Sequence, residues 1–191
     1  SGWGNGLFDF DNDGWKDLFT ANSHVNDLIE TFEETTPYKE PNSVFANLGN
    51  GKFQDVSARA GSGFQTARVH RGAAFADFNR DGRIDVVVSS LGGPAELWEN
   101  VSPGGNHWLH LRLTGSKSNR DGIGAQVLID GGQHNTMTSA VSYASSSHDG
   151  VHFGIGKAES VKKVEIRWPS GTVQTLRDVE INRVVDVREE D

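Results

Sequence analysis

The chain has 191 residues, 35% of them hydrophobic, which is sufficient for one large or two small globular units with a buried core. Its formal net charge of -8 disfavours binding to nucleic acid, and no apolar run approaches the roughly 20 residues needed for membrane insertion. The lack of cysteine excludes disulfides, thiolate catalysis and cysteine-ligated zinc, and the N-terminus lacks the basic and apolar regions of a signal peptide.

Short runs of β-branched and aromatic residues, separated by Gly, Asn, Asp and Pro, predict an all-β fold. In chain order, the first expected strands are 6–10, 17–20, 43–47, 52–56, 72–77, 84–90, 96–100 and 108–114. The later expected strands are 125–130, 135–141, 151–155, 163–168, 173–176 and 183–188. Residues 26–34 are expected to form one or two helical turns that end before Pro37, because the residue preceding a proline disfavours the helical conformation.

A nine-residue acidic motif occurs twice: DFDNDGWKD at 9–17 returns as DFNRDGRID at 77–85, and an apolar strand follows each copy. Side-chain oxygens stand at the first, third, fifth and ninth places, and the residue at the seventh place is expected to contribute its backbone carbonyl. The expected metal ligands are Asp9, Asp11, Asp13, Trp15 and Asp17 in the first loop, and Asp77, Asn79, Asp81, Arg83 and Asp85 in the second.

Both loops are predicted to bind Ca²⁺, because calcium takes about six to eight oxygen ligands and relieves the repulsion among clustered carboxylates. They are not EF-hands, since Thr20 and Val88 stand at the twelfth place, where that motif has Glu. An ordinary hairpin turn is the alternative, and two copies in one register disfavour it. Asn79 replaces the Asp11 of the first loop, so weaker binding is expected in the second.

The two loops and their flanking strands resemble FG-GAP/VCBS repeats, the blades of integrin-α-like β-propellers, and the segment at 48–61 is similar to the end of such a blade. Segments 106–127, 152–156 and 167–176 resemble the ASPIC/UnbV domain. The resemblance implies a partial β-propeller of about two four-stranded blades over residues 1–105, followed by a small antiparallel β-sandwich or barrel over 106–191. The strand NHWLHLRL is expected to end the last blade, to begin the second domain, or to do both.

The resemblance also implies a calcium-binding, non-enzymatic module of extracellular, periplasmic or cell-surface type that mediates adhesion or binds a protein or glycan ligand. A carbohydrate-binding module and an enzyme or accessory protein of a biosynthetic pathway are the alternatives. The GxG at 122–124 lacks the third glycine and the helix of a dinucleotide loop. The adjacent Ser147, His148 and Asp149 lack a GxSxG elbow, so neither a catalytic residue nor an organic cofactor is expected.

Two repeats cannot close a propeller, so the edges of strands 6–10 and 72–77 are expected to need cover. Either the second repeat packs on the C-terminal domain, or chains associate edge to edge. The first repeat is expected to be the less stable half, because it is far from the C-terminal core and carries a long excursion within 24–42.

Overall fold

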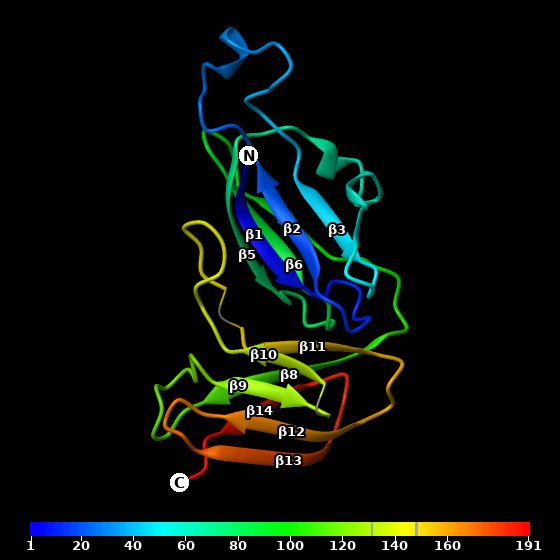
Figure 1. Ribbon diagram of the computed structural model, residues 1–191, viewed down its shortest axis with the longest axis vertical. Helices are drawn as coiled ribbons and strands as arrows, with labels where there is room; N and C mark the ends of the chain where they lie inside the picture. The colour runs from blue at the N-terminus through cyan, green and yellow to red at the C-terminus, as the bar shows by residue number, and fades with distance from the viewer. Residues whose placement is uncertain (131, 148) are drawn as a thin grey trace.

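The computed structural model describes residues 1–130, 132–147 and 149–191, so His148 of the Ser-His-Asp run lies outside the described residues. The described chain contains fourteen strands and three short 3-10 helices, arranged in two units (Figure 1). The prediction of an all-β fold is confirmed. Within these residues, no helix has the length and hydropathy required to cross a bilayer.

The first unit consists of two antiparallel sheets packed face to face (Figure 1). The first sheet contains, in order, β1 (Gly2–Phe8), β2 (Asp17–Asn22), β3 (Ser43–Asn47) and β4 (Phe53–Asp55). The second sheet contains β5 (His70–Ala76), β6 (Asp85–Ser90) and β7 (Glu96–Trp98). The connections carry the 3-10 helices η1 (Ile29–Thr31), η2 (Ser57–Arg59) and η3 (Gly63–Gln65).

Glycines allow the two sheets to approach closely. A Cβ on Gly4 would lie 2.7 Å from the backbone nitrogen of Ala73, and one on Gly6 would overlap the ring of Phe75. Phe75 in turn stacks on Phe8, with 4.6 Å between the ring centroids. The apolar core of the first unit therefore lies between two blade-like sheets, as a partial propeller requires.

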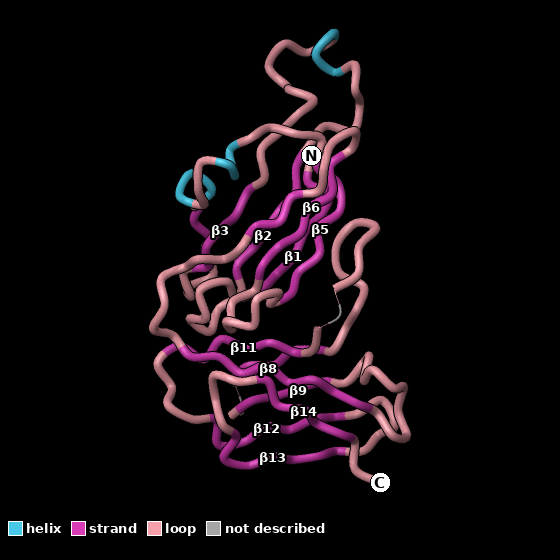
Figure 2. The backbone as a smooth tube through the Cα atoms, turned by 180° about the vertical axis from the view of Figure 1, so that it is seen from behind, coloured by secondary structure: helices cyan, strands magenta, loops and turns pink. Residues whose placement is uncertain are grey.

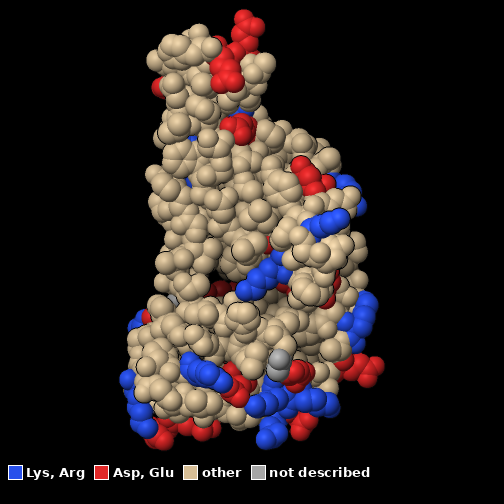
Figure 3. Space-filling model, viewed as in Figure 1, with Lys and Arg blue, Asp and Glu red and all other residues tan. Residues whose placement is uncertain are grey.

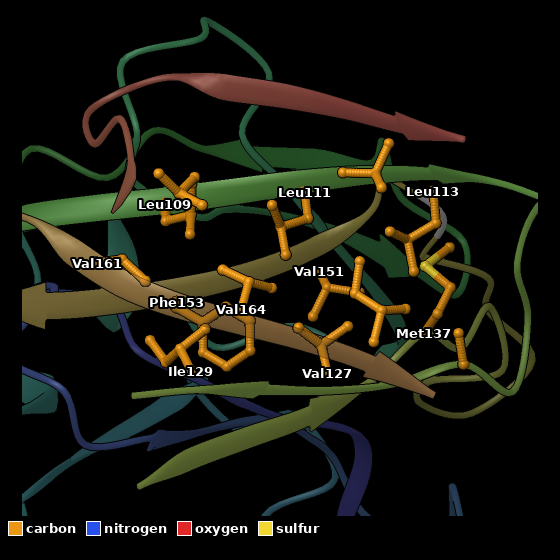
Figure 4. Packing of buried hydrophobic residues seen from close by; sticks show 14 of the residues in the cluster. Leu109, Leu111, Leu113, Val127, Ile129, Met137, Val151, Phe153, Val161 and Val164 are labelled. Atoms are coloured by element: carbon orange, nitrogen blue, oxygen red, sulfur yellow. The ribbon is translucent and has the colours of Figure 1, made fainter. Parts of the chain in front are cut away.

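The second unit is a β-sandwich of two sheets. One sheet has the order β10 (Gln133–Thr136), β9 (Gln126–Ile129), β12 (Val161–Arg167) and β13 (Val173–Val179). The other has the order β11 (Val151–Gly156), β8 (His107–Thr114) and β14 (Val184–Arg188). The buried side chains of both sheets form one core (Figure 4).

The strand NHWLHLRL belongs to this sandwich, because β8 pairs with β11 on one side and with β14 on the other. The second blade consequently has three strands, whereas two four-stranded blades were expected. The pairing of β8 with β14 is parallel, in contrast to the expected antiparallel architecture. Leu109 and Leu111 are buried in the sandwich core, and the alternate residues Trp108 and His110 lie on the opposite face, toward the first unit.

The edge of β5 that does not pair with β6 is covered by the loop 138–147, which Figure 2 shows beside that strand. The backbone N–H groups of Ala73 and Phe75 donate to the hydroxyls of Ser142 and Ser147 at 3.1 and 3.0 Å. Of the two arrangements expected from the sequence, the packing of the second repeat on the C-terminal unit is the one present in this chain. Edge-to-edge association of chains stays a prediction.

The expected helical segment 26–34 contains only η1. The side chain of Asn26 accepts a hydrogen bond from the backbone N–H of Leu28 at 3.0 Å, which gives the chain a local alternative to helical bonding. The remainder of the excursion consists of turns and extended chain.

Glu189 joins the C-terminal end of the chain to the sandwich through hydrogen bonds. Its carboxylate is buried and accepts hydrogen bonds from the successive backbone N–H groups of Ser116, Lys117 and Ser118 at 2.7–2.9 Å. The hydroxyl of Ser170 also donates to it. Burial alone would raise the pKa of Glu189, but the hydrogen bonds from Ser170, Ser118 and Ser116 outweigh burial and lower it to about 2.

Replacing Glu189 by Gln is therefore expected to destabilise the protein at pH 7, because the bound carboxylate loses its charge. Because the pKa of Glu189 is lower in the folded protein than its unfolded value of 4.5, the ionised carboxylate stabilises the fold at pH values above 4.5. This stabilisation is lost as the pH falls through about 2. Urea denaturation between pH 7 and pH 2 should show this dependence in the natural chain and a weaker one in Glu189→Gln. Glu190→Gln, on an exposed neighbour, is the control, and equal behaviour of the two variants would contradict the assignment.

Candidate metal centre at the junction of the two units

The first acidic loop closes the hairpin between β1 and β2. Asp9 accepts hydrogen bonds from the backbone N–H groups of Asp13 at 3.0 Å and Gly14 at 2.8 Å, one on each carboxylate oxygen. Gly14 has a φ of 100°, a conformation that favours glycine. Asp17, the first residue of β2, accepts a hydrogen bond from the backbone N–H of Asn47 at 2.8 Å. The turn thus holds its first and last carboxylates close together.

Three of the predicted ligands converge. Asp9, Asp11 and Asp17 each offer a carboxylate oxygen, and these oxygens lie within 4.8 Å of one another. Asp13 accepts a hydrogen bond from the backbone N–H of Trp15 at 2.8 Å, and the Trp15 side chain is 52% exposed. Oxygens at this spacing can surround one cation with bonds of roughly 2.3–2.6 Å, so the donor set fits calcium.

The electrostatics of the first loop favour a bound cation. The pKa of Asp9 is raised to about 7 and that of Asp17 to about 6, mainly because burial disfavours the charged form. Repulsion from the neighbouring carboxylates raises both pKa values further. The hydrogen bonds from Gly14 and Asn47 act in the opposite direction. Burial also raises the pKa of Asp13 and lowers that of Lys16. A cation would stabilise the ionised carboxylates that burial disfavours.

The second loop has the same backbone geometry. Asp77 accepts hydrogen bonds from the backbone N–H groups of Asp81 at 3.0 Å and Gly82 at 2.7 Å. Asp85 accepts one from the backbone N–H of Asn100 at 2.7 Å, and burial is the main cause that raises its pKa. The repeat seen in the sequence is therefore a repeat of structure.

A guanidinium distinguishes the second loop from the first. Arg83 forms an ion pair with Asp81, and the amide of Asn79 donates to the same carboxylate at 3.0 Å. Arg83 was predicted as a ligand through its backbone carbonyl, and sequence reasoning did not assign a role to its side chain. Because a fixed cation already faces Asp81, the second loop fits calcium less well than the first.

The first loop contacts the second unit, although only the second repeat was expected to pack on that unit. Gly154 of β11 packs on the first loop, where a Cβ would lie 2.5 Å from the Cα of Asn12. The ammonium of Lys16 donates to the side chain of Asn135 in β10 at 3.0 Å. Asn106 donates from its side chain to the carbonyl of Asp11 at 2.9 Å. The candidate metal centre therefore lies at the junction of the two units.

The fold and the site define a two-part protein in which propeller-type blades with acidic hairpin loops precede a β-sandwich. Residues 9–88 match the family model of the FG-GAP-like repeat, and residues 115–191 match that of ASPIC and UnbV. The chain thus combines an FG-GAP-like repeat region with an ASPIC/UnbV domain.

Curated proteins with a similar segment include cartilage acidic protein 1 from three vertebrates. Over 66 residues the chain is 46% identical to the protein of Mus musculus, 44% to that of Homo sapiens and 39% to that of Xenopus tropicalis. Each match covers 34% of this chain and 10% of the relative. The chain therefore spans about a tenth of the length of these relatives.

Proposed function

We propose that the chain is a calcium-binding, non-enzymatic interaction module of extracellular, periplasmic or cell-surface type, which mediates adhesion or binds a protein or glycan ligand. The observation that carries the calcium part is the convergence of Asp9, Asp11 and Asp17 in one turn, in which Asp9 and Asp17 are buried and Asp11 is exposed. The combination of FG-GAP-like repeats with an ASPIC/UnbV domain, and the similarity to cartilage acidic protein 1, support the interaction part.

Calorimetric titration of the metal-stripped protein tests the calcium proposal. Binding is expected, with the first loop tighter than the second. Asp9→Asn should weaken the tighter site at least about tenfold, because it removes a buried ionised ligand. Asp27→Asn removes the same charge from an exposed position outside both loops and should leave the affinity unchanged. The absence of binding at millimolar calcium would overturn the proposal.

Residues 24–39 form an arm that projects from the first unit (Figure 1), and acidic side chains lie at this end of the molecule (Figure 3). The arm carries three exposed apolar side chains: Val25 (65%), Leu28 (57%) and Phe32 (76%). A backbone hydrogen bond of 3.0 Å between His24 and Tyr38 closes its base. We propose the arm tip as the contact surface for a ligand, since exposed aromatic side chains are common anchors of protein interfaces.

If the tip serves contact and not folding, Phe32→Ser should change the free energy of unfolding by no more than about 0.5 kcal/mol. The matched control is Phe64→Ser, a change of the same residue type in the core between the blades, expected to cost about 3–5 kcal/mol. Chemical denaturation of both variants gives these values. A large loss of stability in Phe32→Ser would show that the tip packs against the protein itself.

No observation favours carbohydrate binding over the interaction module. Sugar recognition would use an exposed strip of tryptophans, but of the five tryptophans only Trp15 is mostly exposed. Trp168 is buried in the sandwich core, and Trp98 and Trp108 are partly buried.

A cavity of about 250 Å³ at the junction brings together His110, His152 and Asp149, a combination relevant to the enzyme alternative. One ring nitrogen of each histidine makes a structural hydrogen bond: His110 Nε2 with the Asp149 carbonyl at 2.6 Å and His152 Nε2 with the Gly82 carbonyl at 3.1 Å. The Nδ1 of His110 is buried and has no hydrogen-bond partner among the described residues. Burial is the main cause that lowers the pKa of His152 to about 4. These contacts fit a structural role, so we retain the non-enzymatic proposal.

A further inference from the structure

Asn12 connects the first loop to two other parts of the molecule. It lies between the proposed ligands Asp11 and Asp13, is buried and has a φ of 60°. Its backbone carbonyl accepts a hydrogen bond from the N–H of Gly156 in β11 at 2.8 Å. Its side-chain amide donates to the carbonyl of Gly82 in the second loop at 3.0 Å. One residue of the candidate metal loop therefore contacts both the other loop and the ASPIC/UnbV domain.

The second loop is held from the same face of the sandwich. His152 in β11 also donates to the carbonyl of Gly82, so this oxygen accepts one hydrogen bond from each unit. Trp108 in β8 covers Gly82 so closely that a Cβ there would overlap its indole ring. Trp108 and His152 stack on each other with 6.4 Å between ring centroids. The two loops thus form a single surface against β8 and β11.

We infer that calcium binding in the first loop strengthens the packing of the FG-GAP-like unit on the ASPIC/UnbV domain, an inference that rests on the proposed calcium site. Without a cation, the carboxylates of Asp9, Asp11 and Asp17 repel one another, which opposes the closed turn. The closed turn places the Asn12 carbonyl where it accepts the hydrogen bond from Gly156 in β11. A cation fixes it, so less conformational entropy is lost when β11 docks.

The coupling is reciprocal. If calcium strengthens the contact with β11, then that contact must raise the affinity for calcium by the same factor. A substitution in the second unit that removes a hydrogen bond to the first loop should therefore weaken calcium binding without touching a ligand side chain. Asn106 offers this substitution, because within the described part of the chain its amide donates to the backbone carbonyl of Asp11 and to no ligand side chain of that loop.

Hydrogen exchange with and without calcium, on samples whose calcium binding has been measured by calorimetry, tests the inference. The amide of Gly156 reports the junction directly, since it donates to Asn12 and belongs to a strand without proposed ligands. Calcium should slow its exchange by at least about fivefold. Asn106→Ala should reduce the calcium affinity by roughly two- to tenfold. Asn5→Ala, a change of the same type on the exposed part of β1, should leave it unchanged.

The outcomes separate the inference from the function on which it rests. Calcium binding with unchanged exchange at Gly156, or with full affinity in Asn106→Ala, would overturn the coupling and leave the calcium site standing. No heat of binding at millimolar calcium would overturn both. Slower exchange confined to residues 9–17 and 77–85 would show that calcium acts only within its own loops, and would also reject the coupling.

Discussion

Calcium affinity at the first loop is expected to increase by roughly tenfold or more between pH 6 and pH 8. Calcium binds the ionised carboxylates, and the raised pKa values leave Asp9, about 7, largely protonated and Asp17, about 6, about half protonated at the lower pH. Binding near pH 6 must therefore release protons. Both pKa values are raised above the ordinary value of 3.8, so in the metal-free protein the contribution of these two carboxyl groups to the free energy of unfolding falls as the pH rises. That contribution is smallest above about pH 7.

Calorimetry at pH 6 and pH 8, in two buffers of different ionisation enthalpy, measures both the affinity and the number of protons released. Asp9→Asn should release fewer protons, because the group with the higher pKa is gone. A flat affinity with no proton release would mean that Asp9 and Asp17 are already ionised, and so less desolvated than their burial indicates.

The acidic loops could be predicted from the sequence because the candidate ligands and the turn that orders them lie within nine consecutive residues. The repeat made the prediction specific, and the backbone hydrogen bonds of Asp9 and Asp77 follow the same pattern. The ion pair of Arg83 with Asp81 was not predicted, although both residues are in the motif. Residue order does not reveal whether a long side chain turns back onto its own loop.

The strands could be predicted from their composition and alternation, but their partners could not. Each of the fourteen expected strands overlaps an observed strand, but β10 (Gln133–Thr136) shares only two residues with the expected strand 135–141, and residues 137–141 belong to the loop that follows it. The repeat alignment did not decide whether β8 belongs to the last blade or to the sandwich. Its place is set by pairing with β11 and β14, which are distant from it in sequence. Close approaches such as Gly154 on Asn12 likewise depend on packing between the units, and a lone glycine in a strand gives only a weak signal of them.

Gly154→Ala should be among the most disruptive single-methyl changes in the chain. An added Cβ would lie 2.5 Å from the Cα and 2.7 Å from the carbonyl carbon of Asn12, and backbone atoms cannot yield as a flexible side chain can. The clash also involves the Asp9 carboxylate. We expect a loss of about 1–3 kcal/mol or more in the free energy of unfolding, as for other overpacked sites.

Gly104→Ala is the matched control, since a Cβ at that position meets no atom within 4 Å, and its stability should stay close to that of the natural chain. Denaturation gives the stability, and hydrogen exchange locates the damage, which should be concentrated in residues 9–14 and 151–156. If Gly154→Ala is as stable as Gly104→Ala, then β11 can move away from the first loop at little cost. In that case the contact between the units could not depend on the close approach at Gly154, and the remaining hydrogen bonds from Lys16 and Asn106 would have to maintain it.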